Sequence, residues 1–169
     1  GRRALLGLLA TAGFAGSALA TDGRNPASLL LYPEFDNRTG TATVITVTNV
    51  QVGEAAEDVY VEFVYRGRFG PSNEDIDCLE FNTTELLTPG DTFTALTSTP
   101  AGGGHNPNHS QGFMYAFAKN SQNIPVVHNW LTGNVMTVDG FTQFEFSINP
   151  VAYRGIGDGM FTDRDMDGN

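Results

Sequence analysis

Hydrophobic and polar residues alternate with a period of two along most of the chain beyond residue 20. The clearest stretches are residues 43–50 (TVITVTNV) and 59–65 (VYVEFVY), in which β-branched and aromatic residues dominate. In the second stretch Val61 and Phe63 fall on one side and Glu62 on the other. This pattern is typical of strands that bury one face and expose the other.

Further segments carry the same signal and are separated by turn residues such as Pro89-Gly90-Asp91 and Asp139-Gly140. No gap between them contains the amphipathic helix that a parallel pair of strands needs for its crossover. The sequence therefore predicts an all-β fold, an antiparallel β-sandwich of about eight to nine strands. The further predicted strands are residues 29–32, 78–81, 92–96, 113–118, 125–131, 135–138 and 141–148.

The expected core collects large apolar residues from these strands, and the 12 phenylalanines of the chain supply ample aromatic volume. The predicted core residues are Val47, Val61, Phe63, Leu79, Phe93, Phe113, Tyr115, Phe117, Trp130, Phe144 and Phe146.

The first 20 residues have the pattern of a secretory signal peptide. Two arginines at positions 2 and 3 precede an apolar run at residues 4–10, and the segment ends in Ala18-Leu19-Ala20, after which cleavage is expected. The alternative is an uncleaved membrane anchor, although Gly13 and Gly16 interrupt the run. We expect residues 21–150 to form the sandwich of an exported protein, extracellular, on the cell surface or periplasmic, without a transmembrane segment after cleavage.

The chain has 19 acidic and 9 basic residues, hence a net charge of −10, and its only lysine is Lys119. Cleavage after Ala20 would remove two arginines and leave 19 − 7 = 12 net negative charges. Such a chain has no basic surface for phosphate groups, which argues against a nucleic-acid partner. The single cysteine, Cys78, is expected to be a buried strand residue, the alternative being a disulfide to another chain.

Three stretches resemble immunoglobulin-like β-sandwich modules of bacterial secreted and surface proteins, in particular the cell-adhesion-related type. They are residues 41–50, which contain Val-Thr-Asn before a turn, residues 54–63 (EAAEDVYVEF) and residues 87–93 (LTPGDTF). The resemblance extends from residue 41 to residue 96. It implies an immunoglobulin-like sandwich in which the first stretch is a core strand and the Leu-x-Pro-Gly motif introduces a later strand.

The expected acidic tail, residues 151–169, ends in a partial calcium-loop motif, DRDMDGN. Aspartates stand at the first, third and fifth positions and glycine at the sixth, as in the first half of a loop whose side chains converge on one ion. The motif resembles dockerin-type or thrombospondin-type repeats, which implies calcium as a cofactor; the alternative is an acidic tail without metal. The candidate metal ligands are Asp163, Asp165, Asp167 and Asn169.

The three histidines offer a second candidate metal site. His105 and His109 lie four residues apart, but the glycines at 102–104 and Pro107 preclude a helix that would place them on one face. Two interpretations stay open: a loop site with His128 as third ligand, and histidines without a metal.

No nucleophile elbow or phosphate-binding glycine loop is present in the sequence, and we expect no enzyme. Asp75 and Asp77 either bind a cation or lie in a solvated turn. A glycoside-hydrolase pair of carboxylates is the main catalytic alternative, against ordinary outward-facing strand glutamates. The glutamates in question are Glu62, Glu80, Glu85 and Glu145.

The expected function is that of a non-catalytic exported module, a structural or adhesive part of a longer protein, which contacts an extracellular or surface partner through loops such as residues 101–110. The alternative is a carbohydrate-active protein, either a binding module or a glycoside hydrolase. A row of solvent-facing aromatic residues across one sheet would favour carbohydrate binding, whereas two close carboxylates in a cleft would favour hydrolysis.

Overall fold

A computed structural model of the chain describes residues 25–68, 79–98, 105–107 and 109–156. These residues form an all-β fold of nine strands, and they include no helix, hence none that could cross a membrane. The strands are β1 (Leu29–Asp36), β2 (Thr41–Asn49), β3 (Val59–Arg68), β4 (Leu79–Leu87), β5 (Thr92–Leu96), β6 (Gln111–Lys119), β7 (Leu131–Asp139), β8 (Phe144–Ile148) and β9 (Val151–Tyr153).

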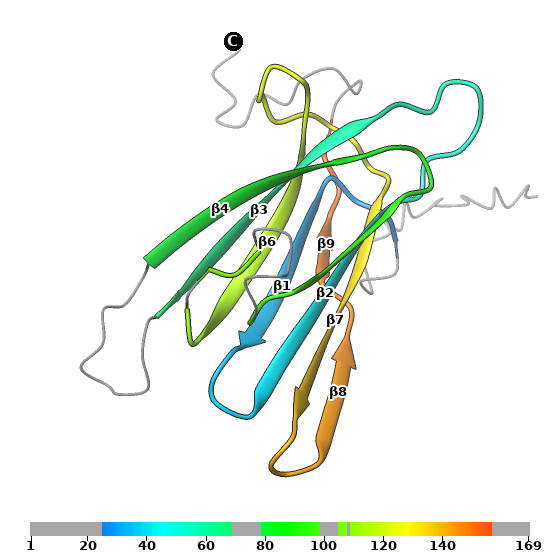
Figure 1. Cartoon of the computed structure of the whole chain (residues 1–169). Helices are drawn as coiled ribbons and strands as arrows, with labels where there is room; N and C mark the ends of the chain where they lie inside the picture. Colours follow the sequence, from blue (N-terminus) through cyan, green and yellow to red (C-terminus); the bar gives the residue numbers. More distant parts are fainter. Residues whose placement is uncertain (1–24, 69–78, 99–104, 108, 157–169) are drawn as a thin grey trace, which may run out of the picture.

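The strands form two antiparallel sheets, which lie one behind the other in Figure 1. The five-stranded sheet has the order β4-β3-β6-β1-β9, and the four-stranded sheet has the order β5-β2-β7-β8. This arrangement confirms the predicted antiparallel β-sandwich.

Both ends of the described chain pass from one sheet to the other. Ala27 forms an isolated bridge with Leu131 of β7, and the chain then enters β1 in the five-stranded sheet. At the other end β8 pairs with β7, and after Pro150 the chain continues as β9 beside β1. Because proline has no N–H to donate, it suits the point at which one pairing stops and the next begins. The two crossings tie the sheets together along this side.

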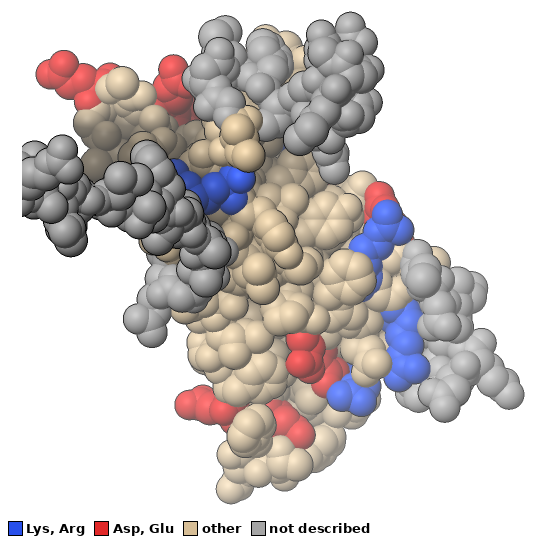
Figure 2. All heavy atoms as spheres, turned by 180° about the vertical axis from the view of Figure 1, so that it is seen from behind, with Lys and Arg blue, Asp and Glu red and all other residues tan. Residues whose placement is uncertain are grey.

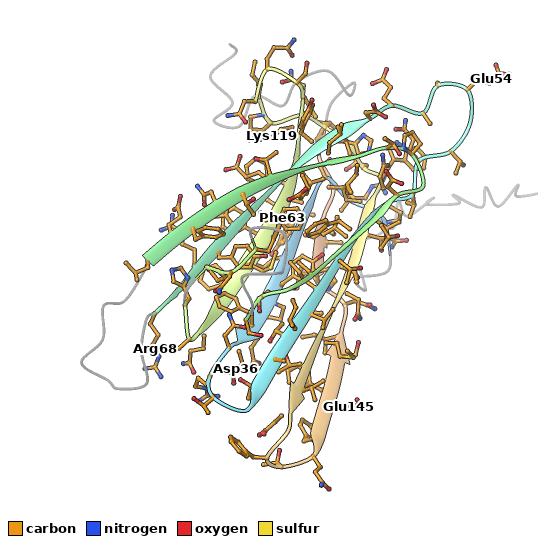
Figure 3. The ribbon with its side chains drawn as sticks, viewed as in Figure 1. Asp36, Glu54, Phe63, Arg68, Lys119 and Glu145 are labelled. Atoms are coloured by element: carbon orange, nitrogen blue, oxygen red, sulfur yellow. The ribbon has the colours of Figure 1, made fainter. Side chains whose placement is uncertain are left out.

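The core lies between the sheets, with Phe63 near its middle (Figure 3). Tyr32 of β1 reaches across this layer, and its hydroxyl donates a 2.7 Å hydrogen bond to the carbonyl oxygen of Thr46 in β2. Gly133 of β7 makes room for that side chain, since a Cβ added there would lie 2.2 Å from the Tyr32 hydroxyl. The largest fully buried side chains are Tyr32, Tyr65, Phe35, Phe63, Leu30, Ile45, Met114 and Leu131.

The prediction that Phe113, Tyr115 and Phe117 of β6 point into the core was wrong. Met114, Ala116 and Ala118 are the buried residues of this strand, whereas Phe113 is 44% exposed on the opposite side. Ala116 pairs with Phe63 of β3, so the large ring of Phe63 occupies the space in front of a small neighbour. The aromatic residues of β6 therefore lie outside the sandwich.

Other predicted core positions also differ. Trp130, which precedes β7, is 46% exposed, and Phe144, near the tip of the β7–β8 hairpin, is 59% exposed. The strand predicted at 125–131 does not form, because only Pro125 makes an isolated bridge, to Lys119, before β7 starts at Leu131. The prediction also missed β9. Val47, Val61 and Phe63 are buried as predicted, whereas Leu79, Phe93, Tyr115, Phe117 and Phe146 are partly exposed.

Candidate functional site

The outer surface of the five-stranded sheet carries a group of apolar side chains that we call the aromatic face. Three neighbouring strands contribute to it, and its residues alternate with those that point into the core. The members are Phe113, Tyr115 and Phe117 of β6, Leu29 and Leu31 of β1, and Val151 and Tyr153 of β9.

The strand register aligns six of these seven residues in two rows across the sheet, whereas Phe113 pairs with Arg66 of β3 and faces the irregularity of β1 between Tyr32 and Phe35. Leu29 pairs with Phe117 on one side and with Tyr153 on the other. Leu31 pairs with Tyr115 and with Val151 in the next row. Since directly opposite side chains in antiparallel strands lie close together, each row is a continuous apolar strip.

Two of the four rings of the aromatic face are half-exposed, and those of Tyr115 and Phe117 are more buried. Phe113 is 44% exposed and Tyr153 52% exposed. The rings of Tyr115 and Phe117 lie nearly parallel, with centroids 6.2 Å apart and an interplanar angle of 24°. Figure 2, which shows the molecule from the side of this sheet, has an uncharged region across its middle with acidic and basic residues at the margins. A contiguous exposed apolar patch of this kind marks an interaction site in many proteins.

Polar residues of β3 and β4 continue the same rows. The row of Phe117 extends to Glu62 and Thr84, and the row of Tyr115 extends through Val64 to Asn82. The Asn82 side-chain amide donates a 2.8 Å hydrogen bond to Glu80. The β6, β1 and β9 side of the outer surface is thus apolar, and the β3 and β4 side mixes hydrogen-bonding groups with apolar residues such as Val64 and Leu86.

Two ion pairs border the aromatic face. Lys119, at the end of β6, is only 3% exposed and pairs with Glu62 of β3. Arg66 of β3 pairs with Glu80 of β4, and both of these side chains are about 40% exposed. Lys119 and Arg68 lie near opposite ends of the sheet in Figure 3. Lys119 and Arg66 are therefore each paired with a glutamate within the chain.

The outer surface of the four-stranded sheet has a different composition. Two of its rows consist mainly of threonine: Thr48 pairs with Thr92 and Thr132, and Thr46 pairs with Thr94 and Asn134. The neighbouring rows are aliphatic or thioether-bearing: Val44 pairs with Leu96 and Met136, and Ala42 pairs with Val138. The hydroxyls of Thr48 and Thr92 lie 2.8 Å apart and share a hydrogen bond. We call this surface the threonine face; no aromatic residue of the described strands points outward from it.

The structure places His105 inside the sandwich. It is fully buried between Phe63 and Phe93, whose ring centroids lie 4.7 and 4.5 Å from that of the imidazole. Its Nδ1 is 2.8 Å from the Tyr65 hydroxyl, and its Nε2 is 3.1 Å from a carboxylate oxygen of Glu85. Because a carboxylate only accepts, Nε2 carries the proton and Nδ1 accepts from Tyr65.

Burial shifts the pKa of both rings in this cluster. Desolvation lowers the pKa of His105, and the hydrogen bond and charge of Glu85 oppose that effect only in part. Desolvation also raises the pKa of Tyr65, and the charge of Glu85 raises it further. The cluster therefore holds a neutral imidazole and a neutral phenol, an arrangement that fixes residues 105–107 against β3, β4 and β5.

The other two histidines have different surroundings. His109 is 5% exposed and stacks on Phe35, whereas His128 Nε2 lies 3.1 Å from the side-chain oxygen of Asn49. Desolvation by burial lowers the pKa of both. The structure does not bring the three histidines together, and the described residues hold no cluster of three potential metal ligands. Residues 105 and 109 of the expected contact loop point inward.

The four glutamates considered for catalysis lie apart on the sandwich. Glu62 and Glu80 are on the outer surface of the five-stranded sheet, each paired with a basic residue. Glu85 points to His105, and Glu145 lies on β8 of the other sheet. Cys78, Asp75 and Asp77, together with the candidate calcium ligands Asp163, Asp165, Asp167 and Asn169, lie outside the described residues.

The aromatic face was missed in the sequence because its rings were assigned to the core. The signal was present in the run 112–118 (GFMYAFA), where every residue is apolar or glycine and no polar face remains. A strand that is apolar on both sides is expected to be covered on both sides. Comparisons with protein-family models, with curated proteins and with solved structures find no match to this chain.

Proposed function

We propose that the chain is a non-catalytic, exported β-sandwich module, a structural or adhesive part of a longer secreted or surface protein, and that it contacts its extracellular partner through the aromatic face. The observation that carries this proposal is the pair of apolar rows on one outer surface, together with the half-exposed rings of Phe113 and Tyr153. Single exposed apolar residues are common, but aligned rows across three strands are the kind of patch that a partner covers.

The environment of the acidic residues supports a binding role over a catalytic one. Glu62, Glu80 and Glu85 each have a basic or imidazole partner within the chain. A hydrolase of the two-carboxylate type needs one carboxyl group as acid and a second as base or nucleophile, facing each other across the substrate. In the sandwich Glu62 links β3 to β6, Glu80 links β4 to β3, and Glu85 links β4 to His105.

A second candidate function, carbohydrate binding, is favoured by the type of side chain on the aromatic face. Tyr115, Phe113 and Tyr153 are rings, and rings present a broad flat surface with little conformational freedom to lose. The polar residues that continue their rows, Asn82 and Thr84, offer hydrogen-bonding groups beside that surface.

An adhesion assay tests the proposed function. Beads coated with the full chain would be sheared from surfaces bearing neutral polysaccharide, gelatin or a hydrocarbon layer. We expect the variant Phe113→Ser/Tyr153→Ser to lose at least about tenfold of the adhesion to whichever surface retains the wild type. The matched variant Thr92→Ser/Thr94→Ser alters two exposed strand positions on the threonine face and should adhere as the wild type does. Equal adhesion of all three proteins to every surface would contradict the proposal.

A further inference from the structure

We infer that the occupant of the aromatic face is a neutral polysaccharide chain, laid along β6 so that its sugar rings stack on Phe113 and Tyr115, with a further contact at Tyr153, which lies two strands away on β9 in the row of Phe117. This inference rests on the proposed function and specifies the class of partner. It follows from the size of the face, from its position within the sheet and from its charge.

The apolar part of the surface is narrow. From Phe113 to Phe117 the strand rises about 14 Å, and three strands at about 4.8 Å spacing give a comparable width, so the face covers roughly 200 Å² in projection. A stable protein interface buries about 800 Å² on each side. The aromatic face alone would therefore supply only a fraction of such an interface, whereas a narrow chain molecule would cover it.

The position of the face argues against an extended peptide. Peptides that bind sheets usually add a strand at an edge, where backbone N–H and C=O groups are unpaired. β6 is a central strand between β3 and β1, so its backbone groups are already used by both neighbours. The ligand must be recognised by side chains alone.

Charge selects a neutral ligand. The chain carries a net charge of −10, which repels polyanions. Two of the basic residues that border the face, Lys119 and Arg66, are each paired with a glutamate. An anionic polysaccharide would have to break these pairs to use those two cations, whereas a neutral one would leave them intact.

The two halves of the outer surface match the two sides of a sugar ring. A pyranose has C–H groups on its flat faces, which pack on aromatic rings, and hydroxyl groups at its rim, which donate and accept hydrogen bonds. The row of Tyr115 runs through Val64 to Asn82, and the row of Phe117 runs to Glu62 and Thr84. A chain stacked along β6 would therefore have hydrogen-bonding partners for its hydroxyl groups on the β3 and β4 side.

The test is affinity electrophoresis of the full chain in native gels that contain xyloglucan, barley β-glucan or galactomannan, with alginate and pectate as anionic arms. At least one neutral polysaccharide should retard the wild type, and neither anionic one should. Two substitutions at one position separate stacking from general hydrophobicity. Phe113→Tyr keeps the ring and should retain the retardation, whereas Phe113→Leu keeps the apolar character but removes the ring and should weaken binding at least about tenfold.

The matched pair at β9 is Tyr153→Phe and Tyr153→Leu, with the same expected difference. No retardation by any neutral polysaccharide, retardation by anionic ones only, or equal retardation of the leucine and wild-type proteins would each overturn the inference. If the bead assay shows adhesion to gelatin that depends on Phe113 and Tyr153 while the gels show no retardation, the proposed function stands and the polysaccharide inference fails. If neither the bead assay nor the gels show the expected dependence on Phe113 and Tyr153, the proposed function and the polysaccharide inference both fail.

Discussion

The two outer surfaces of this sandwich share a backbone design and a core, but only the surface of the five-stranded sheet carries outward-facing aromatic residues among the described strands. The threonine face is built from residues such as Thr46, Thr48 and Thr94, which suit strands and are compatible with water. The aromatic face presents Phe113 and Tyr153 in comparable positions on antiparallel strands. The threonine face shows that an exposed sheet surface of this sandwich can form without aromatic residues. The rings of the aromatic face are therefore not needed for folding.

This difference points to function because exposed rings carry a cost. They add little to the core, since Met114, Ala116 and Ala118 supply the inward side of β6. They also add apolar surface that promotes aggregation unless a partner covers it. A threonine at position 113 would serve the strand equally well. The rings are therefore best explained by what they contact outside the chain.

The largest effect on stability is expected from a substitution that pushes the two sheets apart. Tyr32 spans the core to the Thr46 carbonyl, and Gly133→Ala would place a methyl group 2.2 Å from its hydroxyl and 2.4 Å from the Thr46 oxygen. We expect a loss of about 3 kcal/mol in the free energy of unfolding, measured by urea denaturation. Gly140→Ala is the matched control, because its nearest neighbour would be an ordinary 3.4 Å away. Equal stability of the two variants would show that Tyr32 does not fix the sheet spacing.

A smaller effect is expected from the ion pair that borders the aromatic face. Glu62→Ala would leave the Lys119 ammonium, 3% exposed, without its carboxylate. We expect a loss of about 2 kcal/mol by urea denaturation, moderated because the Glu62 side chain is 18% exposed.

Two controls accompany the Glu62 variant. The double variant Glu62→Leu/Lys119→Met should recover most of the loss, since apolar side chains of similar size can replace a buried pair. Glu80→Ala, at the exposed Arg66 pair, should cost less than about 1 kcal/mol. A Glu80 variant that is less stable than the Glu62 variant would reverse our assignment of the buried pair.

The sandwich could be predicted from the sequence because alternation and turn residues are local signals. Strands such as Val59–Arg68 and Thr92–Leu96 follow directly from them. The inward side of β6 could not be predicted, because both of its sides are apolar and only the position of Phe63 on the neighbouring strand decides between them. β9 was missed for another reason: a strand of three residues after Pro150 has too few positions to show a period.

The candidate site was predictable only in outline. Solvent-facing aromatic residues were the feature that would favour carbohydrate binding, but their rows depend on pairing between strands that are distant in sequence, such as Leu29 with Tyr153. The role of His105 was equally hidden. A histidine that follows three glycines looks exposed, and only the approach of β3 and β4 surrounds it with Tyr65 and Glu85.

Acid should weaken the interior before it alters either outer face. Burial lowers the pKa of His105, His109 and His128, so the unfolded chain binds protons that the folded chain does not. This stability is fully present above the unfolded pKa of about 6.5 and declines as the pH falls below it. In urea titrations below pH 6.5, His105→Gln should reduce the slope of stability against pH by the equivalent of about one proton. An unchanged slope would mean that His105 is already charged in the folded protein.

The smallest effect is expected from a variant that makes the threonine face more apolar without adding rings. Thr48→Val/Thr92→Val removes the hydroxyl pair at 2.8 Å but keeps the β-branched shape, so the unfolding free energy should change by less than about 0.5 kcal/mol. Retention on a hydrophobic-interaction column should nevertheless rise, because the variant exposes four methyl groups where two methyls and two hydroxyls stood. If apolar area alone explained binding, this variant should also gain adhesion and retardation in polysaccharide gels. Because valine offers no flat surface for stacking, we expect neither gain, which would locate the difference between the two faces in their rings.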